Sequence, residues 1–245
     1  MSMIVLIRKR VLAGSILVCF CLAGMSAVFW AGLRPAGVPA LAAEGVGPVT
    51  VVIDPGHGGE DGGAVSPDGV PESRINLEIS LRLHELLRFM GQRTLLIRTE
   101  DISVHTEGET MRARKVSDIR RRVELVNGTE NAVLLSIHQN SLPSSPVTHG
   151  AQVFWNGAEG AEGLAAVVQD ALNTAVNRGN EKQSRKIPDT IYLMKHVTAP
   201  AILAECGFLS NREETALLQT PSHQLKLAGA IAAGYLRCLA GEEVP

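Results

Sequence analysis

Residues 49–59, which read V-T-V-V-I-D-P-G-H-G-G, decide the fold of this 245-residue chain. The first six residues are mostly β-branched and apolar, and the run ends abruptly in proline, glycine and His57. Such a pattern predicts a buried strand over Val49–Asp54 that leads into a glycine-rich loop. The strand is therefore expected to lie inside a sheet that is covered on both faces.

Strand and helix patterns alternate along the rest of the chain. Further strands are predicted over 94–98, 132–138, 150–155, 191–194 and 201–205. Helices are predicted from Ser73 to a C-terminal Gly91, through 116–126 and 164–176, and from Thr220-Pro221 to Leu239. The fold class is α/β, with a mostly parallel central sheet flanked by helices on both faces in a single domain.

The first 42 residues are predicted to be a targeting element. A basic cluster precedes Val11–Leu33, which has no charged residue and is long enough to cross a bilayer as a helix. The segment is expected to engage the membrane or the export machinery, so that residues 43–245 lie outside the cytoplasm. Ala40–Ala42 fits a signal-peptide cleavage site, whereas the length of the apolar run fits a retained anchor, and both interpretations stay open.

Charge and cysteine content narrow the class of protein. Of 23 Lys and Arg, four precede Ala43, which leaves 19 against 25 Asp and Glu and a net charge of −6 on the exported part. This balance argues against a nucleic-acid partner. Only Cys206 and Cys238 belong to the domain, so no disulfide framework is expected, although one bridge is open.

The polar residues at the predicted strand ends are the candidates for chemistry, because ligands of open α/β sheets collect at the carboxyl ends of strands. These are His57, His138 and Glu205, and Glu72 adds a carboxylate where the first helix begins. Two imidazoles and one carboxylate suffice for catalytic zinc, and the remaining carboxylate can act on water. Taken singly, His57 also fits a simple turn residue, and Glu72 fits a charge favoured by the helix dipole.

Other catalytic motifs do not fit. Gly56 and Gly58 begin a G-x-G-x-x-G pattern, but Asp61 stands at its last position and would repel phosphate. The sequence has no phosphate-binding G-x-x-x-x-G-K-[ST], no G-x-S-x-G elbow and no H-E-x-x-H helix. The absence of these motifs disfavours a nucleotide-binding protein, a serine hydrolase and a zincin protease.

Several longer stretches make a family recognisable. They are I-D-P-G-H-G-G-E-D-G-G-A (53–64), S-D-I-R-R-R-V-E-L-V-N (117–127), S-I-H-Q-N (136–140) and P-A-I-L-A-E-C-G-F-L-S-N (200–211). With them the chain resembles the zinc-dependent N-acetylmuramoyl-L-alanine amidases of the Amidase_3 type. The resemblance implies one zinc ion held by His57, Glu72 and His138, with Glu205 as the catalytic acid/base. It also implies a peptidoglycan substrate, in which the amide bond between N-acetylmuramic acid and L-alanine is hydrolysed.

Two departures refine the resemblance. Gln139 stands where the family often has alanine, and the short segment 141–163 leaves no room for the autoinhibitory helix of cell-division amidases. The chain looks most like the germination-specific, spore-cortex subgroup, in which stem removal precedes formation of muramic δ-lactam. Another exported zinc peptidase and a non-catalytic wall-binding module are the alternatives. The sequence does not identify an activator protein.

Overall fold

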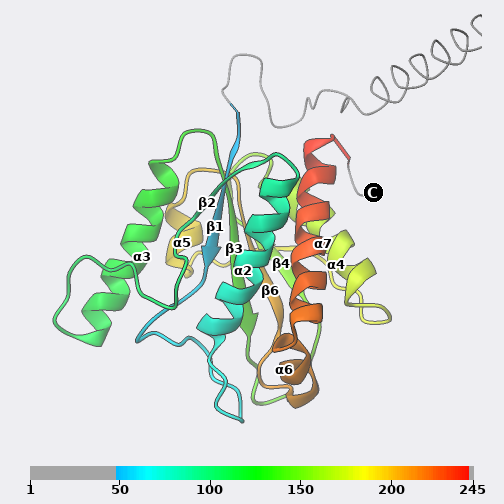
Figure 1. The fold of residues 1–245 in the computed structure, drawn as a ribbon, viewed down its shortest axis with the longest axis horizontal. Coiled ribbons are helices and arrows are strands. Elements are labelled where there is room, and N and C mark those ends of the chain that lie inside the picture. The colour runs from blue at the N-terminus through cyan, green and yellow to red at the C-terminus, as the bar shows by residue number, and fades with distance from the viewer. Residues whose placement is uncertain (1–47, 243–245) are drawn as a thin grey trace, which may run out of the picture. The chain divides into compact units, whose positions relative to one another are not determined.

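A six-stranded sheet, in the order β2-β1-β3-β6-β4-β5, forms the centre of the domain (Figure 1). The computed structural model describes residues 48–242. The strands are β1 (Thr50–Pro55), β2 (Arg93–Leu96), β3 (Ala132–Asn140), β4 (Gln152–Trp155), β5 (Arg185–Lys186) and β6 (Ala201–Phe208). Neighbouring strands are parallel except where β4 meets β6. The predicted mostly parallel sheet is confirmed.

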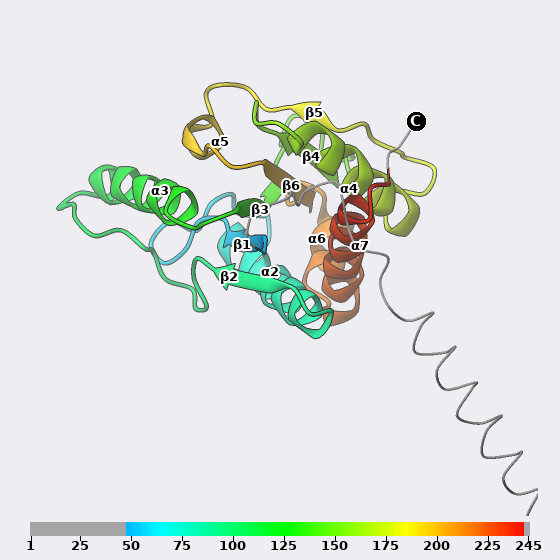
Figure 2. The same cartoon turned by 90° about the horizontal axis from the view of Figure 1, so that it is seen from above.

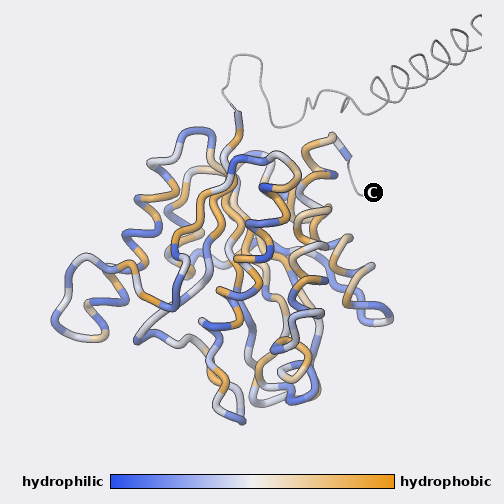
Figure 3. Tube along the Cα trace, viewed as in Figure 1, coloured by the Kyte–Doolittle hydropathy of each residue, from blue (hydrophilic) through white to orange (hydrophobic). Residues whose placement is uncertain are grey.

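Helices cover both faces of this sheet (Figure 2). They are α2 (Glu72–Phe89), α3 (Met111–Asn127), α4 (Ala161–Ala175), α5 (Tyr192–His196), α6 (Arg212–Leu218) and α7 (Pro221–Leu239). Helices α3 and α5 lie on one face, and α2, α4 and α7 lie on the other. Each face has its own buried apolar cluster, and the apolar residues gather along the central strands (Figure 3).

The apolar run of β1 follows from this double cover. Val51 and Ile53 pack into the cluster beneath α2 and α7, whereas Val52 packs into the cluster beneath α3. All three side chains are fully buried. Successive residues of a strand point to opposite faces, so a strand buried on both faces needs apolar residues throughout.

Local signals fix the ends of two long helices as predicted. After α2, Gly91 has a φ of +80° and its N–H bonds to the carbonyl of Arg88, which closes the helix. Before α7, the Thr220 side chain accepts from the N–H of His223, and Pro221 occupies the first helical position.

Some predicted elements are wrong. Residues 191–194 were expected to form a strand, but Tyr192–His196 form the short helix α5, which buries Leu193 and Met194. An apolar run of four residues is too short for its periodicity to separate strand from helix. Strand β5 and helix α6 had not been predicted, although Asn211 caps α6 by accepting from the N–H of Glu214.

The ends of two central strands also differ from the prediction. Strand β3 continues past His138 to Asn140, and β6 continues past Glu205 to Phe208. The side chains of His138 and Glu205 therefore project from within paired strands, which hold them more firmly than a loop would. The register shifts between His138 and Asn140, where the pairing of β3 with β6 is irregular.

The predicted targeting element and its cleavage site lie outside the described residues. Within residues 48–242, no helix combines the length and apolar character needed to span a bilayer. Cys206 and Cys238 are both free thiols. The disulfide left open by the sequence is therefore not formed in this structure.

Candidate metal site

The loop after β1 holds His57 in an unusual backbone conformation. His57 has a φ of +59°, in the left-handed region that non-glycine residues rarely adopt. Two buried arginines fix the loop by donating to its carbonyl oxygens: Arg122 bonds to those of Pro55 (2.9 Å) and His57 (2.7 Å), and Arg98 to those of Pro55 (2.9 Å) and Gly56 (3.0 Å). The surrounding structure thus holds a strained residue in place, as is common at functional sites.

Two carboxylates, the buried Asp54 and the partly buried Asp118, balance the charge of Arg122. This arginine forms ion pairs with Asp54 and Asp118, and Ser136 donates to Asp54 at 2.7 Å. Burial alone would raise the pKa of Asp54, but the charges of Arg122 and His138 and the hydrogen bonds from Ser136 and Arg122 together outweigh it and hold the pKa below its usual value. The network beneath the loop is therefore ionised and hydrogen-bonded.

Two glycines of the loop are required by close approach. A Cβ on Gly56 would lie 2.3 Å from ring atoms of His138. A Cβ on Gly63, which has a φ of +70°, would lie 2.6 Å from Glu72 Oε2 and 2.7 Å from His57 Cδ2. The loop backbone consequently passes directly against the candidate metal ligands, and only glycine leaves room for them.

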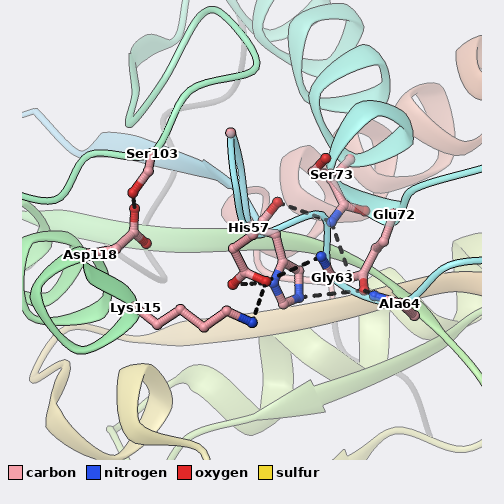
Figure 4. A network of polar contacts seen from close by, with 12 residues as sticks. His57, Gly63, Ala64, Glu72, Ser73, Ser103, Lys115 and Asp118 are labelled. Carbon is pink, nitrogen blue, oxygen red and sulfur yellow. Dashed lines mark hydrogen bonds and ion pairs between the residues drawn. The ribbon is translucent and has the colours of Figure 1, made fainter. Parts of the chain in front are cut away.

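His57, Glu72 and His138 come together at the carboxyl end of the sheet. Their candidate ligand atoms all lie within 4.8 Å of one another. His138 Nδ1 is 2.8 Å from Glu72 Oε1, and His57 Nε2 is 3.4 Å from Glu72 Oε2. Figure 4 shows His57 and Glu72 side by side, with Lys115 reaching toward them from α3. Among the described residues this is the one group of three or more such side chains with metal-binding geometry.

The two histidines keep Glu72 ionised. Burial alone would raise the pKa of Glu72, but the hydrogen bond and charge of His138, the charge of His57 and the N–H of Ala64 lower it to about 2. Burial opposes the charged form of His138, but the hydrogen bond and charge of Glu72, with the charges of Glu205 and Asp54, together raise the pKa of this imidazole. A negative carboxylate between two imidazoles is a suitable set of ligands for a divalent cation.

Glu205 lies beside this cluster but in a different environment. It pairs in register with His138 across β3 and β6, and together with His57 and His138 it lines a cleft that is described below. Its Oε2 is buried with no hydrogen-bond partner in the described part of the chain. Burial, with a contribution from the charge of Glu72, raises the pKa of Glu205 to about 7, although the two histidines counteract this rise. A carboxyl group with such a pKa can both take up and release a proton near neutral pH.

Asp61 is a residue whose role at the site the sequence did not indicate. Its Oδ2 lies 2.9 Å from His57 Nδ1, and its Oδ1 lies 2.7 Å from Lys115 Nζ. Burial would raise the pKa of Asp61, but the bonds to His57 and Lys115 hold it well below its usual range. An ionised Asp61 can accept a hydrogen bond from the Nδ1–H of His57, which leaves Nε2 unprotonated and free to bind a cation.

The buried arginine Arg122 was also missed. A signal was present, because Arg122 is spaced at helical intervals from the apolar Ile119 and Val126 of α3. A charged residue on an apolar helix face needs a buried partner, but the sequence could not show that Asp54 supplies it.

The candidate site opens into a cleft of about 300 Å³. Ile119 and Arg122 of α3 form one wall, and Ile191 and Leu193 at α5 form another. His57, His138 and Glu205 line the same cleft. A substrate group in this cleft can therefore reach His57 and His138 from solvent, whereas Glu72 is buried beneath them.

Comparison with known proteins agrees with this site. The sequence profile of the Amidase_3 family, described as N-acetylmuramoyl-L-alanine amidase, matches residues 51–237. The chain belongs to this family and is an amidase of bacterial peptidoglycan. The match includes every residue of the candidate metal site.

Individual relatives narrow the comparison. The chain is 40% identical to the germination-specific N-acetylmuramoyl-L-alanine amidase of Bacillus subtilis strain 168, over 76% of this chain and 78% of that protein. It is 26% identical to the amidase AmiC of Neisseria meningitidis, but spans only about half (52%) of that protein's length. Among solved structures, the CwlD amidase of Clostridioides difficile, in complex with the GerS lipoprotein, is 33% identical with a TM-score of 0.75, covering 79% of this chain and all of that one.

Proposed function

We propose that this protein is a zinc-dependent amidase that cuts the bond between N-acetylmuramic acid and L-alanine, with His57, Glu72 and His138 as the metal ligands and Glu205 as the acid/base. The observation that carries the proposal is the gathering of three ligand atoms within 4.8 Å beside a carboxyl group whose pKa is raised to about 7.

The side chains fit zinc in number and kind. Two imidazole nitrogens and one carboxylate oxygen form a three-ligand set typical of catalytic zinc sites. The unpartnered Oε2 of Glu205 beside them supports a role that involves a further group in the cleft. When bound, zinc would lower the pKa of water and polarise the amide carbonyl.

Glu205 performs the proton transfers in this mechanism. Its carboxylate takes a proton from the water that attacks the carbonyl carbon of the lactyl amide. The resulting carboxylic acid then gives the proton to the nitrogen of L-alanine as the C–N bond breaks. The raised pKa of Glu205 suits both steps, because it lies near neutral pH. No covalent intermediate with the protein is required.

We infer that the biological substrate is spore-cortex peptidoglycan. This assignment is supported by the 40% identity to a germination-specific amidase and by the likeness to CwlD. Removal of stem peptides would then precede formation of muramic δ-lactam.

The N-terminal segment would direct the domain across the cytoplasmic membrane, either as a cleaved signal or as an anchor. The complex of CwlD with a lipoprotein supports a lipoprotein as a binding partner of this chain.

Mass spectrometry of purified muropeptides tests the reaction. Incubation with the full-length protein and zinc is expected to release intact stem peptides with a new free L-alanine amino group. Free amino acids would instead indicate an exopeptidase, and new reducing sugar ends would indicate a glycosidase. Zinc binding without any product would point to the wall-binding module.

A further inference from the structure

Two buried carboxamides lie in series behind Glu72. Gln139 Nε2 donates to Asn76 Oδ1 at 3.2 Å, and Asn76 Nδ2 donates to Glu72 Oε1 at 3.1 Å and to the carbonyl of Gly56 at 3.2 Å. Asn76 is fully buried and Gln139 is 3% exposed. The chain of bonds starts at the position where the family often has alanine and ends on a candidate metal ligand.

The orientation of the Asn76 amide follows from its neighbours. If the amide were turned over, Oδ1 would face Glu72 Oε1 and the Gly56 carbonyl, which are both acceptors. Gln139 Nε2 would then face the amino group of Asn76, so that two donors would meet. The donor on Gln139 therefore acts with these two acceptors to select the orientation in which Asn76 donates to the carboxylate.

Packing alone does not explain a glutamine at position 139. Its Oε1 is buried and has no hydrogen-bond partner within residues 48–242. Burying such an oxygen is unfavourable, and an apolar side chain of similar volume would avoid the cost. Besides an interaction with the Cys206 thiol, what the glutamine adds over an apolar residue is the donor that it directs at Asn76.

We propose that Gln139 is a positioning residue for the metal-binding carboxylate of Glu72 and acts through Asn76; this inference rests on the proposed role of Glu72. Besides His138, Glu72 Oε1 has two donors, the backbone N–H of Gln139 (3.0 Å) and Asn76 Nδ2. The first is fixed by strand β3. The second depends on the orientation of the Asn76 amide, which the Gln139 donor and the Gly56 carbonyl hold together. Groups that orient a ligating carboxylate in this way set the affinity of a metal site.

The test measures zinc affinity in the full-length protein, by competition with a chromophoric chelator. Gln139→Met keeps the volume of the side chain and removes the donor, and we expect it to weaken zinc binding about tenfold. The visible absorption spectrum of the Co²⁺-substituted protein should change as well, because it reports the geometry of the ligands. Gln169→Met is the matched control, since Gln169 is an equally buried glutamine on α4 that bonds to Val153 and Ala151. It should leave zinc affinity and the Co²⁺ spectrum unchanged.

A double-mutant cycle tests the path of the effect. If Gln139 acts through Asn76, Asn76→Leu should weaken zinc binding at least as much, and adding Gln139→Met to it should cause no further loss. Gln139→Ala, which introduces the residue common in the family, replaces Gln139→Met should that variant fail to fold, and it should weaken zinc binding by about threefold or more.

Two results would overturn the inference. One is a position-139 variant with zinc affinity within about twofold of the parent and an unchanged Co²⁺ spectrum. The other is a double variant whose loss is the product of the two single losses. In either case a parent protein that binds zinc and releases stem peptides would leave the proposed function standing. Failure of the parent itself to bind zinc would instead contradict the proposed function.

Discussion

Two glutamates beside the same imidazoles have pKa values that are shifted in opposite directions. The pKa of Glu72 is lowered to about 2, because His138 and His57 face it and backbone N–H groups bond to it. The pKa of Glu205 is raised to about 7, because it is buried without such donors and next to the charge of Glu72. Their surroundings make one a permanent anion and the other a group that exchanges protons.

Exchanging each glutamate for glutamine should separate these roles. Glu205→Gln retains volume but cannot accept a proton, so kcat should fall about 10²–10⁴-fold while zinc content stays near one per chain. Glu72→Gln should lose zinc, because a neutral amide is a poorer ligand than a carboxylate. Metal analysis and initial rates for both variants are the measurement. Our division of roles would be wrong if Glu205→Gln remained active or lost zinc while Glu72→Gln kept it.

The raised pKa of Glu205 also predicts a pH-dependent stability of the metal-free protein. Because the folded state binds this proton more tightly than the unfolded state, the stabilisation is complete below the ordinary pKa of 4.5 and is lost as pH rises through about 7. Relative to the parent, Glu205→Gln should therefore gain roughly 1–3 kcal/mol in free energy of unfolding between pH 4.5 and pH 8. Urea unfolding in the presence of a chelator measures this difference, and a difference independent of pH would contradict it.

At the scale of elements, the loop between β1 and α2 is the part of the site that tolerates substitution least. Two arginines from outside the loop, Arg98 and Arg122, hold its carbonyl groups, and its glycines lie against the candidate ligand side chains. The loop is thus rigid although it lacks regular secondary structure. Its geometry depends on α3 as much as on its own sequence.

Gly56→Ala should disturb the ligands without unfolding the domain. The new Cβ would lie 2.3 Å from the ring of His138, so the imidazole must move. A ligand displaced by about 1 Å can reduce turnover about 10²-fold, and zinc affinity should fall as well. Gly163→Ala in α4 is the control, because no atom lies within 4 Å of its new Cβ, and the free energy of unfolding should rise by up to about 1 kcal/mol. Normal zinc affinity in Gly56→Ala would argue against the close contact.

At the scale of the whole domain, the order of the strands assembles the site. Strands β1, β3 and β6 are neighbours and parallel. The loop with His57 and the strand positions of His138 and Glu205 therefore meet at the carboxyl end of these strands. Glu72 enters from α2, which packs across the same strands. The two apolar clusters lie along the strands and under the helices and do not include the ligands.

The metal-free protein should therefore stay folded and should be stabilised by zinc. Zinc at 100 times its dissociation constant adds about 2.7 kcal/mol to a fold that binds it at one site. For a domain of this size, that corresponds to an increase in Tm of about 5–10 °C. Differential scanning calorimetry with and without a chelator measures the increase. His138→Ala should abolish it, and an increase that persists in this variant would place the zinc elsewhere.

The sequence by itself determined the alternation of strands and helices, the helix ends at Gly91 and Thr220, and the residue types at the carboxyl edge of the sheet. These features depend on local causes: apolar periodicity, backbone preferences of glycine and proline, and capping bonds between near neighbours. Where the local signal was weak, as for residues 191–194 at the start of α5, the prediction was wrong. The burial of Leu193 and Met194 against the sheet decided that segment instead.

Only the tertiary structure decided which charges are buried, which partners they have and how their pKa values shift. Arg122 reaches Asp54 across 68 positions of the chain, and Glu72 reaches His138 across 66. The same is true of the donor series from Gln139 to Glu72, which joins β3 to α2. Desolvation and electrostatic pairing depend on which groups meet in space, so residues whose local sequence looks ordinary can become buried ions, ligands or proton carriers.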